Sequence, residues 1–195
     1  MSGIPYVIEK TEKGERSYDL YSRLLKDRIV FVAGSFNEQM SNAIVAQLLF
    51  LDANEKEKEI YMYINSRGGE IQAMYAIYDT MRHIQSDIIT VGFGTVMSAG
   101  SFILAAGTKG KRYALPNSAI MIHELSGGTS GKFNDLLVTH KHIEQLYNKM
   151  AKQYAEMTGQ KVSKIKKDME RDCYMTAEEA KAYGLIDEIQ WNRSQ

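Results

Sequence analysis

The segment "EIYMYINSRGGEIQAMYAIYDTMRHIQSDIITVGF", residues 59–93, carries the pattern that decides the fold class. The β-branched and aromatic side chains of residues 59–65 predict a strand, and "SRGGE" (66–70) predicts a turn. Apolar side chains then recur at helical spacing as far as His83, and "DIITVGF" (87–93) predicts another strand. Two strands joined by a helical crossover indicate an α/β fold with mainly parallel pairing.

The same alternation continues on both sides of this unit. "RIVFVAG" (28–34) predicts a strand that ends at Gly34, and residues 37–54 predict an amphipathic helix. After residue 93 we predict a buried helix in "SFILAAG" (101–107), strands in "KRYAL" (111–115) and "SAIMIH" (118–123), an amphipathic helix over 131–158 stopped by Gly159, a helix in "TAEEAKAYG" (176–184) and a closing strand in "LIDEIQW" (185–191).

The beginning of the chain differs from the rest. Its first 16 residues are polar and punctuated by glycine, which predicts a mobile arm, and residues 17–195 are predicted to form one domain. Ser17 is predicted to cap a short helix whose apolar positions are Leu20, Tyr21, Leu24 and Leu25. A short leader trimmed before Ile4 is a further expectation.

Composition excludes several classes of protein. The 195 residues include 24 Lys or Arg and 24 Asp or Glu, so no general attraction to nucleic acid or anionic membrane is expected. The longest weakly polar run, 93–107, is too short for a membrane-spanning helix, and the N-terminus has no signal-peptide or transit pattern. The single cysteine, Cys173, excludes an intrachain disulfide and fits a reducing compartment, so we predict a cytoplasmic location.

Two serines, Ser98 and Ser101, lie in the small and aliphatic run "FGTVMSAGSFILAAG" (93–107). Ser98 follows a predicted strand and precedes a predicted helix, whose free N–H groups and dipole favour negative charge on an oxygen. The sequence approximates the G-x-S-x-G nucleophile elbow, with Val96 at the first glycine position and Gly100 kept. Ser98 is therefore either a nucleophile or a helix-capping serine in a small-residue turn.

A nucleophilic serine needs a base, and the chain has four histidines. His83 and His142 are predicted to be solvated, and His140 falls on the apolar stripe of the long helix, where we predict a packed, hydrogen-bonded role. His123 ends the strand "AIMI" and precedes the loop "ELSGG". Because the carboxyl ends of strands are where α/β sheets build sites, we select His123 as the base.

A candidate site also needs a carboxylate to orient the histidine and backbone N–H groups to bind an anion. The segment "KKDMERDCYM" (166–175) holds several acidic residues, and Asp172 is only narrowly preferred over Asp168 and Glu170. It lies where charged residues give way to apolar ones, so its carboxylate could be buried enough to orient an imidazole. The two glycines of "INSRGGE" (64–70) either point backbone N–H groups at an anion or form an ordinary turn.

Taken together, these blocks resemble the proteolytic subunit of the ATP-dependent Clp protease, a family of serine peptidases. Matching segments occur in order and spacing along nearly the whole chain. They are "GERSYDLYSRLLKDRIVF", "IVAQLLFLDA", "YMYINSRGG", "AIYDTM", "GTVMSAGSF", "AAGTKGKRYALPNS", "MIHE" and "MERDCYMTAEEAKAYGLID".

The resemblance implies a fold, an activity and a set of site residues. The fold would be the crotonase-like β/α superhelix with a protruding handle helix at about 127–158. Ser98 would be the nucleophile, His123 the base and Asp172 the triad aspartate, with backbone N–H groups of Gly69 and Ala99 as the oxyanion hole. The chain would be a self-compartmentalising endopeptidase that hydrolyses unfolded polypeptides to short peptides, without metal or cofactor. Specificity would come mainly from access to a chamber.

The resemblance also implies partners. Two stacked heptameric rings, a tetradecamer, would enclose the active sites, and the rings would be either homomeric or mixed with a paralogous subunit. The handle and its approach (Gly127, Gly128, Gly131) would join the rings, and Glu170 and Arg171 would couple ring contact to triad alignment. The N-terminal arm would line an axial pore fed by an AAA+ unfoldase such as ClpX, ClpA or ClpC. Docking residues would be Tyr61, Tyr63, His83, Val91, Phe93, Tyr113 and Gln190.

Three departures from the family pattern lead to hypotheses. Arg67 replaces a proline, which would free the loop that carries an oxyanion donor and weaken peptide cleavage. Glu124-Leu125 replaces Gln-Pro beside the base. His83 and Gln190 replace apolar docking residues, which suggests a different unfoldase or a mixed particle. Two alternatives stay open: a catalytically weak or silent structural subunit of a mixed ring, and an acyl-CoA enzyme on the same fold.

Overall fold

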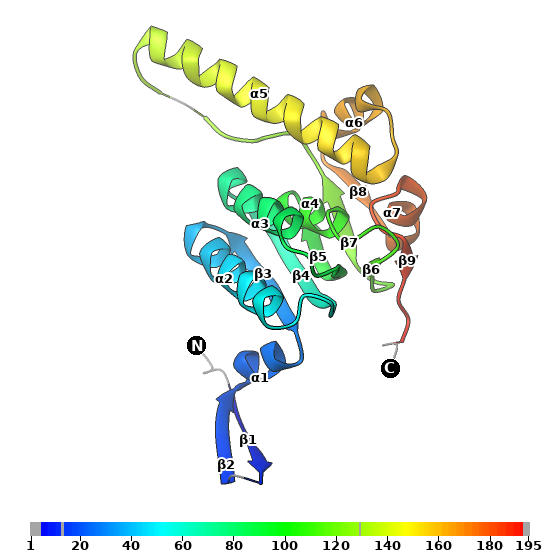
Figure 1. The fold of residues 1–195 in the computed structure, drawn as a ribbon. Helices are drawn as coiled ribbons and strands as arrows, with labels where there is room; N and C mark the ends of the chain where they lie inside the picture. The colour runs from blue at the N-terminus through cyan, green and yellow to red at the C-terminus, as the bar shows by residue number, and fades with distance from the viewer. Residues whose placement is uncertain (1–4, 13, 129, 193–195) are drawn as a thin grey trace.

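A mostly parallel sheet forms the centre of the molecule, as Figure 1 shows. The computed structural model describes residues 5–12, 14–128 and 130–192. The sheet runs in the order β3-β4-β5-β6-β9, while β7 pairs with β5 and β8 pairs with β7. Its strands are β3 (Ile29–Phe36), β4 (Ile60–Gly69), β5 (Ile88–Met97), β6 (Arg112–Ala114), β7 (Ala119–Ile122), β8 (Cys173–Met175) and β9 (Glu188–Ile189). Only β8 runs antiparallel to its neighbour, so the predicted α/β class with mainly parallel pairing is confirmed.

The helices α2, α3 and α4 cover one face of this sheet, and the long helix α5 projects from one end of it (Figure 1). The helices are α1 (Leu20–Lys26), α2 (Glu38–Asn54), α3 (Ile71–His83), α4 (Ala99–Ala105), α5 (Phe133–Thr158), α6 (Val162–Met169) and α7 (Ala177–Tyr183). Figure 1 shows α2, α3 and α4 side by side. The side chains of β4 explain this arrangement, because Met62 and Ile64 are fully buried while Tyr61 and Tyr63 on the other face are half-buried.

The N-terminal residues form a hairpin where the sequence predicted only a polar arm. β1 (Tyr6–Thr11) and β2 (Gly14–Asp19) pair antiparallel. Ser17 lies within β2, so its predicted capping role is wrong; Asp19 caps α1 instead, accepting a 3.0 Å hydrogen bond from the Ser22 N–H. The mobility of this arm stays a prediction, and the trimming point before Ile4 lies outside the described residues.

Several element boundaries also differ from prediction. The segment 66–69, predicted as a turn, is the end of β4, because it pairs with residues 35 and 36 of β3. The closing strand β9 is only two residues long, and it pairs with β6, which is itself only three residues long. The strand β8 was not predicted. The helix from residue 131 is confirmed as α5, and Gly159 ends it with φ of 78°.

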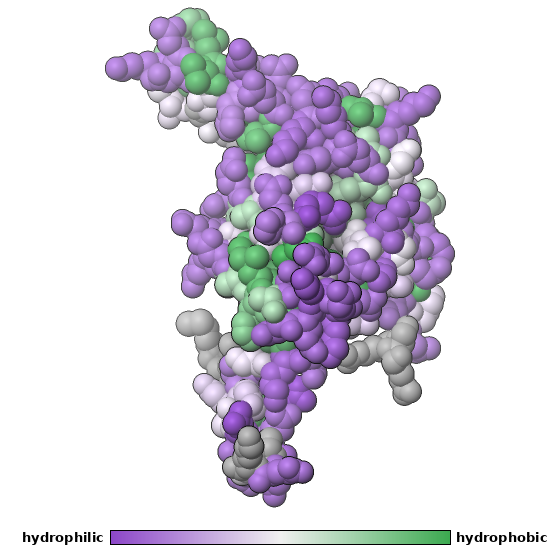
Figure 2. All heavy atoms as spheres, viewed as in Figure 1, coloured by the Kyte–Doolittle hydropathy of each residue, from purple (hydrophilic) through white to green (hydrophobic). Residues whose placement is uncertain are grey.

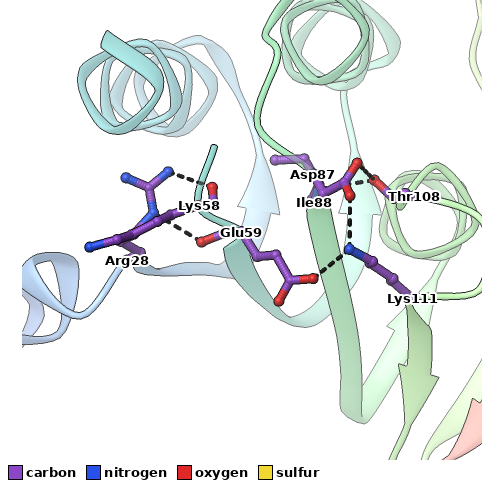
Figure 3. Close-up of polar contacts among 7 residues, drawn as sticks. All are labelled: Arg28, Lys58, Glu59, Asp87, Ile88, Thr108 and Lys111. Carbon is purple, nitrogen blue, oxygen red and sulfur yellow. Dashed lines mark hydrogen bonds and ion pairs between the residues drawn. The ribbon is translucent and has the colours of Figure 1, made fainter. Parts of the chain in front are cut away.

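Hydrogen bonds and ion pairs of polar side chains connect the amino ends of neighbouring strands (Figure 3). Arg28, directly before β3, donates through Nε to the Glu59 carbonyl and through Nη2 to the Lys58 carbonyl, each at 2.9 Å. The Lys111 ammonium bridges the carboxylates of Glu59 and Asp87, which precede β4 and β5. This network occupies the end of the sheet that lies opposite the carboxyl ends of the strands, and leaves those ends for a site.

An ion pair between the buried Arg112 and the partly buried Asp187 ties β6 to the ends of two helices. Arg112 donates to Asp187 at 2.6 Å through Nη2 and at 2.9 Å through Nε. Its Nη1 also donates to the carbonyls of Ala105 and Met157, at the C-terminal ends of α4 and α5. Burial favours a higher pKa for Asp187, but the Arg112 guanidinium and its hydrogen bonds outweigh burial and lower that pKa.

Replacing Asp187 by alanine is expected to lower the free energy of unfolding by about 3–5 kcal/mol, because Arg112 would stay buried without its counter-charge. Since the folded pKa of Asp187 is lowered, the pair stabilises fully above about pH 4 and this contribution is lost as pH falls through the folded value. Denaturant unfolding at pH 7 and pH 3 measures both effects. Glu188→Gln, which removes an exposed pair with Lys181, is the control and should change stability little.

The long helix α5 extends beyond the body of the molecule (Figure 1). Its C-terminal half packs into the core through Met150 and Tyr154, but its N-terminal half leaves apolar side chains exposed, with Phe133 at 74%. Figure 2 shows this apolar group at the protruding tip. His140 is exposed as well, so its predicted packed role is wrong: the stripe has no surface of this chain to pack against there. Within the described residues, no helix combines the length and apolar character needed to cross a membrane.

Candidate active site

Four segments meet at the carboxyl end of the sheet. Ser98 directly follows β5, His123 directly follows β7, and Gly69 ends β4. Asp172 directly precedes β8, and because β8 runs antiparallel to β7, its first residue pairs with the last residue of β7. The pairing of Ile122 with Cys173 therefore brings Asp172 next to His123.

Ser98 occupies a strained turn between β5 and α4. Its φ of 55° and ψ of −122° place a non-glycine residue in a sparsely populated region, which costs about 1–3 kcal/mol. Its backbone N–H donates to the Met121 carbonyl at 2.9 Å, and its carbonyl accepts from the Phe102 N–H at 3.0 Å. Ser98 makes no side-chain cap to α4, so the hydroxyl is directed to another partner.

That partner is His123, whose Nε2 lies 2.9 Å from Ser98 Oγ. The other ring nitrogen, Nδ1, lies 3.4 Å from Asp172 Oδ1. A proton on Nδ1, held toward the carboxylate, leaves the Nε2 lone pair facing the serine hydroxyl. The structure thus brings the three predicted side chains together. The expected burial of Asp172 is wrong, because its side chain is 53% exposed.

The glycines at the end of β4 lie against the serine turn. A Cβ on Gly68 would stand 2.6 Å from Ser98 Cβ and 3.1 Å from the Ala99 nitrogen, so only glycine allows this approach. Ala99 is the first residue of α4, and the first N–H groups of a helix have no acceptor within it. The glycine pair and the first residue of α4 therefore lie directly beside Ser98.

This glycine segment is held against β3. Gly68 and Gly69 pair with Ser35 and Phe36 of β3. The Ser66 hydroxyl donates to the Gly34 carbonyl and accepts from the Gly68 N–H at 3.0 Å. Arg67 itself is exposed. These contacts argue against the free loop that the loss of proline at this position suggested.

A pocket of about 250 Å³ opens beside Ser98. Its apolar walls come from α3, the loop after β7, and α5, and they comprise Met74, Leu125, Ile143, Leu146 and Met150. The sequence reasoning missed this pocket and expected specificity to come mainly from chamber access. The helical stripe that includes Met150 and Tyr154 was visible in the sequence, but nothing local showed that it would face the serine.

The remaining predicted residues are placed as follows. Glu170 and Arg171 are exposed on an open groove that also contains His123 and Asp172. Tyr63 and Tyr113 flank Val91 on adjacent strands, and Phe93 stacks edge-on against Tyr63.

Val91, which lies between Tyr63 and Tyr113, is only 1% exposed. A docking segment would therefore contact the aromatic side chains instead of the valine. Tyr61 belongs to the same face of β4, two residues before Tyr63. His83 is exposed at the C-terminal end of α3, and Gln190 follows β9.

Across residues 5–12, 14–128 and 130–192, no three His, Cys, Asp or Glu side chains gather as a metal ion would need. At the site, the Ser98 hydroxyl contacts the His123 imidazole, which in turn lies beside the Asp172 carboxylate. Two glycines and the first residue of α4 lie next to Ser98. In a comparison with protein families, the model of the family described as Clp protease matches residues 12–193. Because that match covers nearly all of the 195 residues, the chain belongs to the Clp protease family.

Proposed function

We propose that this chain is a serine endopeptidase that hydrolyses unfolded polypeptides to short peptides, with Ser98, His123 and Asp172 as its catalytic residues. The observation that carries the proposal is the 2.9 Å contact between Ser98 Oγ and His123 Nε2 at a strained turn. A capping serine would bond the backbone of its own helix, and Ser98 makes no such bond.

The proposed chemistry follows from the positions of the groups. His123 Nε2 takes the proton of Ser98 as the oxygen attacks a peptide carbonyl, and returns that proton to the leaving amine. Asp172 orients the imidazole through Nδ1. The N–H groups of Gly69 and Ala99 stabilise the oxyanion, and a water molecule then hydrolyses the acyl-enzyme.

We further propose that the chain acts inside two stacked heptameric rings in the cytoplasm, where an AAA+ unfoldase feeds it. The exposed apolar tip of α5 supports a role for this helix in joining rings, since such a group is normally covered by a partner. Tyr61, Tyr63, Phe93 and Tyr113 support docking of an unfoldase segment on the outer face of the sheet. The departures at His83 and Gln190 favour an unfoldase of altered specificity or a mixed particle.

Reaction with a fluorophosphonate probe tests the proposal, because the probe modifies only an activated serine. We expect one adduct per chain, located on Ser98 by peptide mapping, together with cleavage of a denatured polypeptide. Absence of the adduct from the assembled particle would favour a silent structural subunit. Binding of a CoA thioester in place of probe reaction would favour an acyl-CoA enzyme.

Substituting Gly68 by alanine is expected to lower peptide hydrolysis by about 10²-fold or more, because the new methyl group displaces Ser98 from its position. Gly110→Ala is the matched control: Gly110 also has a positive φ, of 85°, but a Cβ there meets nothing within 4 Å. Initial rates on a fluorogenic peptide compare the two variants. A Gly68→Ala enzyme as active as Gly110→Ala would contradict the proposed close approach.

A further inference from the structure

Tyr154 is a buried polar side chain that the proposed chemistry does not use. It belongs to the last turns of α5 and is 2% exposed, with its ring edge-on to Phe102 at a centroid distance of 5.0 Å. Its hydroxyl lies 3.1 Å from Ser101 Oγ and 3.5 Å from the Ser98 carbonyl oxygen. Burial raises the pKa of this phenol, so it keeps its proton as a hydrogen-bond donor.

Ser101 connects this phenol to two backbone carbonyls. Its Oγ lies 2.8 Å from the Ser98 carbonyl oxygen and 2.7 Å from the Met121 carbonyl oxygen. A serine hydroxyl has one proton, so it can donate to only one of these carbonyls at a time. Tyr154 supplies the second proton, either to Ser101 Oγ or to the Ser98 carbonyl. Without it, the buried Ser101 oxygen would have no donor in this cluster.

The two carbonyls belong to the two arms of the candidate site. Ser98 carries the nucleophile, and Met121 lies on β7 two residues before His123. The Ser98 N–H also donates to the same Met121 carbonyl. Ser101 and Tyr154 therefore cross-link the serine turn to the strand that carries the base, and they hold Ser98 in its unfavourable φ and ψ.

We propose that Tyr154 is a positioning residue: its hydroxyl, acting through Ser101, fixes the serine turn on β7 and so sets the contact between Ser98 and His123. The inference rests on the proposed function for its effect on rate, but the structural link can be tested without it. It also assigns a role to the buried C-terminal end of α5. The exposed N-terminal end of the same helix is the part proposed to join rings.

The test compares Tyr154→Phe with Tyr75→Phe in the assembled particle. Tyr75 is also buried and edge-on to Phe102, but its hydroxyl bonds Gln153 instead of the serine turn. We expect Tyr154→Phe to lower kcat and the rate of fluorophosphonate reaction about tenfold or more, with KM within about twofold, because misplacement of reacting groups slows the chemical step. Tyr75→Phe should change neither rate. Equal rates in the two variants would overturn the proposed effect on catalysis.

Two further measurements keep the outcome clear. Ser101→Ala should lower the same rates, and the double variant should be no slower than the slower single variant, because both act through one network. Additive losses would overturn the shared network. Amide hydrogen exchange over residues 98–102 should be faster in Tyr154→Phe than in Tyr75→Phe. This measurement does not depend on activity, so it applies even if the wild-type protein does not react with the fluorophosphonate. Unchanged exchange there would overturn the structural link, whereas an unreactive wild type would overturn only the proposed function.

Discussion

Replacing Ser98 by alanine is expected to abolish fluorophosphonate labelling and to lower kcat for peptide hydrolysis by about 10⁴–10⁶-fold. The substitution removes the hydroxyl oxygen that lies 2.9 Å from His123 Nε2, and thus the nucleophile of the proposed reaction. The fold should not suffer, because the turn is held by backbone bonds of Ser98 to Met121 and Phe102 that alanine also makes.

The measurement is the initial rate on a fluorogenic peptide, with circular dichroism and particle size to verify assembly. Ser86→Ala is a suitable control, since Ser86 is also buried but bonds Arg28 and the Lys56 carbonyl near the amino ends of the strands. Wild-type activity in Ser98→Ala would remove this serine from the mechanism, whatever its geometry.

Replacing Asp172 by asparagine is expected to lower kcat by about 10²–10⁴-fold with little effect on KM. An asparagine can direct its amide NH₂ toward His123 Nδ1, which selects the tautomer whose Nε2 carries the proton and cannot accept one from Ser98. We expect less than the full loss of a buried triad, because Asp172 is 53% exposed and water can take over part of its role.

Asp168→Asn provides the matched control for this experiment. Asp168 is the nearby carboxylate that the sequence left open, but it accepts hydrogen bonds from Lys164 and Tyr183 at 2.5 and 2.7 Å, away from the imidazole. Its variant should retain kcat. If Asp168→Asn were the slower enzyme, or if Asp172→Asn stayed within about threefold of wild type, Asp172 would not be the residue that orients His123.

The sequence predicted the elements that local rules govern. Helices such as α2, α5 and α7 have apolar side chains at helical spacing, and α7 adds a capping box between Thr176 and Glu179. Ser98 and His123 could be identified from the sequence for the same reason, because each directly follows a segment with the pattern of a strand. A site at the carboxyl ends of parallel strands then follows from the class of fold.

Pairing between distant segments explains most of the errors. "SRGG" (66–69) reads as a turn because glycines lack β-propensity, yet these residues extend β4 because β3 lies beside them and bonds to them. The stripe on α5 predicts burial along its whole length. His140 is nevertheless exposed, because periodicity reports which face is apolar and says nothing of where a partner surface ends.

The sequence by itself thus determined the α/β class and most of the helices, and it indicated Ser98 and His123 as candidates for the site. Local composition preferred Asp172 only narrowly over Asp168 and Glu170, and the family resemblance named it, but the physical reason for that choice lies in the tertiary structure. The choice is made by β8, a three-residue strand whose antiparallel pairing with β7 sets Asp172 beside His123. So short a strand has too little periodicity to be seen in sequence, and its stability comes from a neighbour about fifty residues away in the chain.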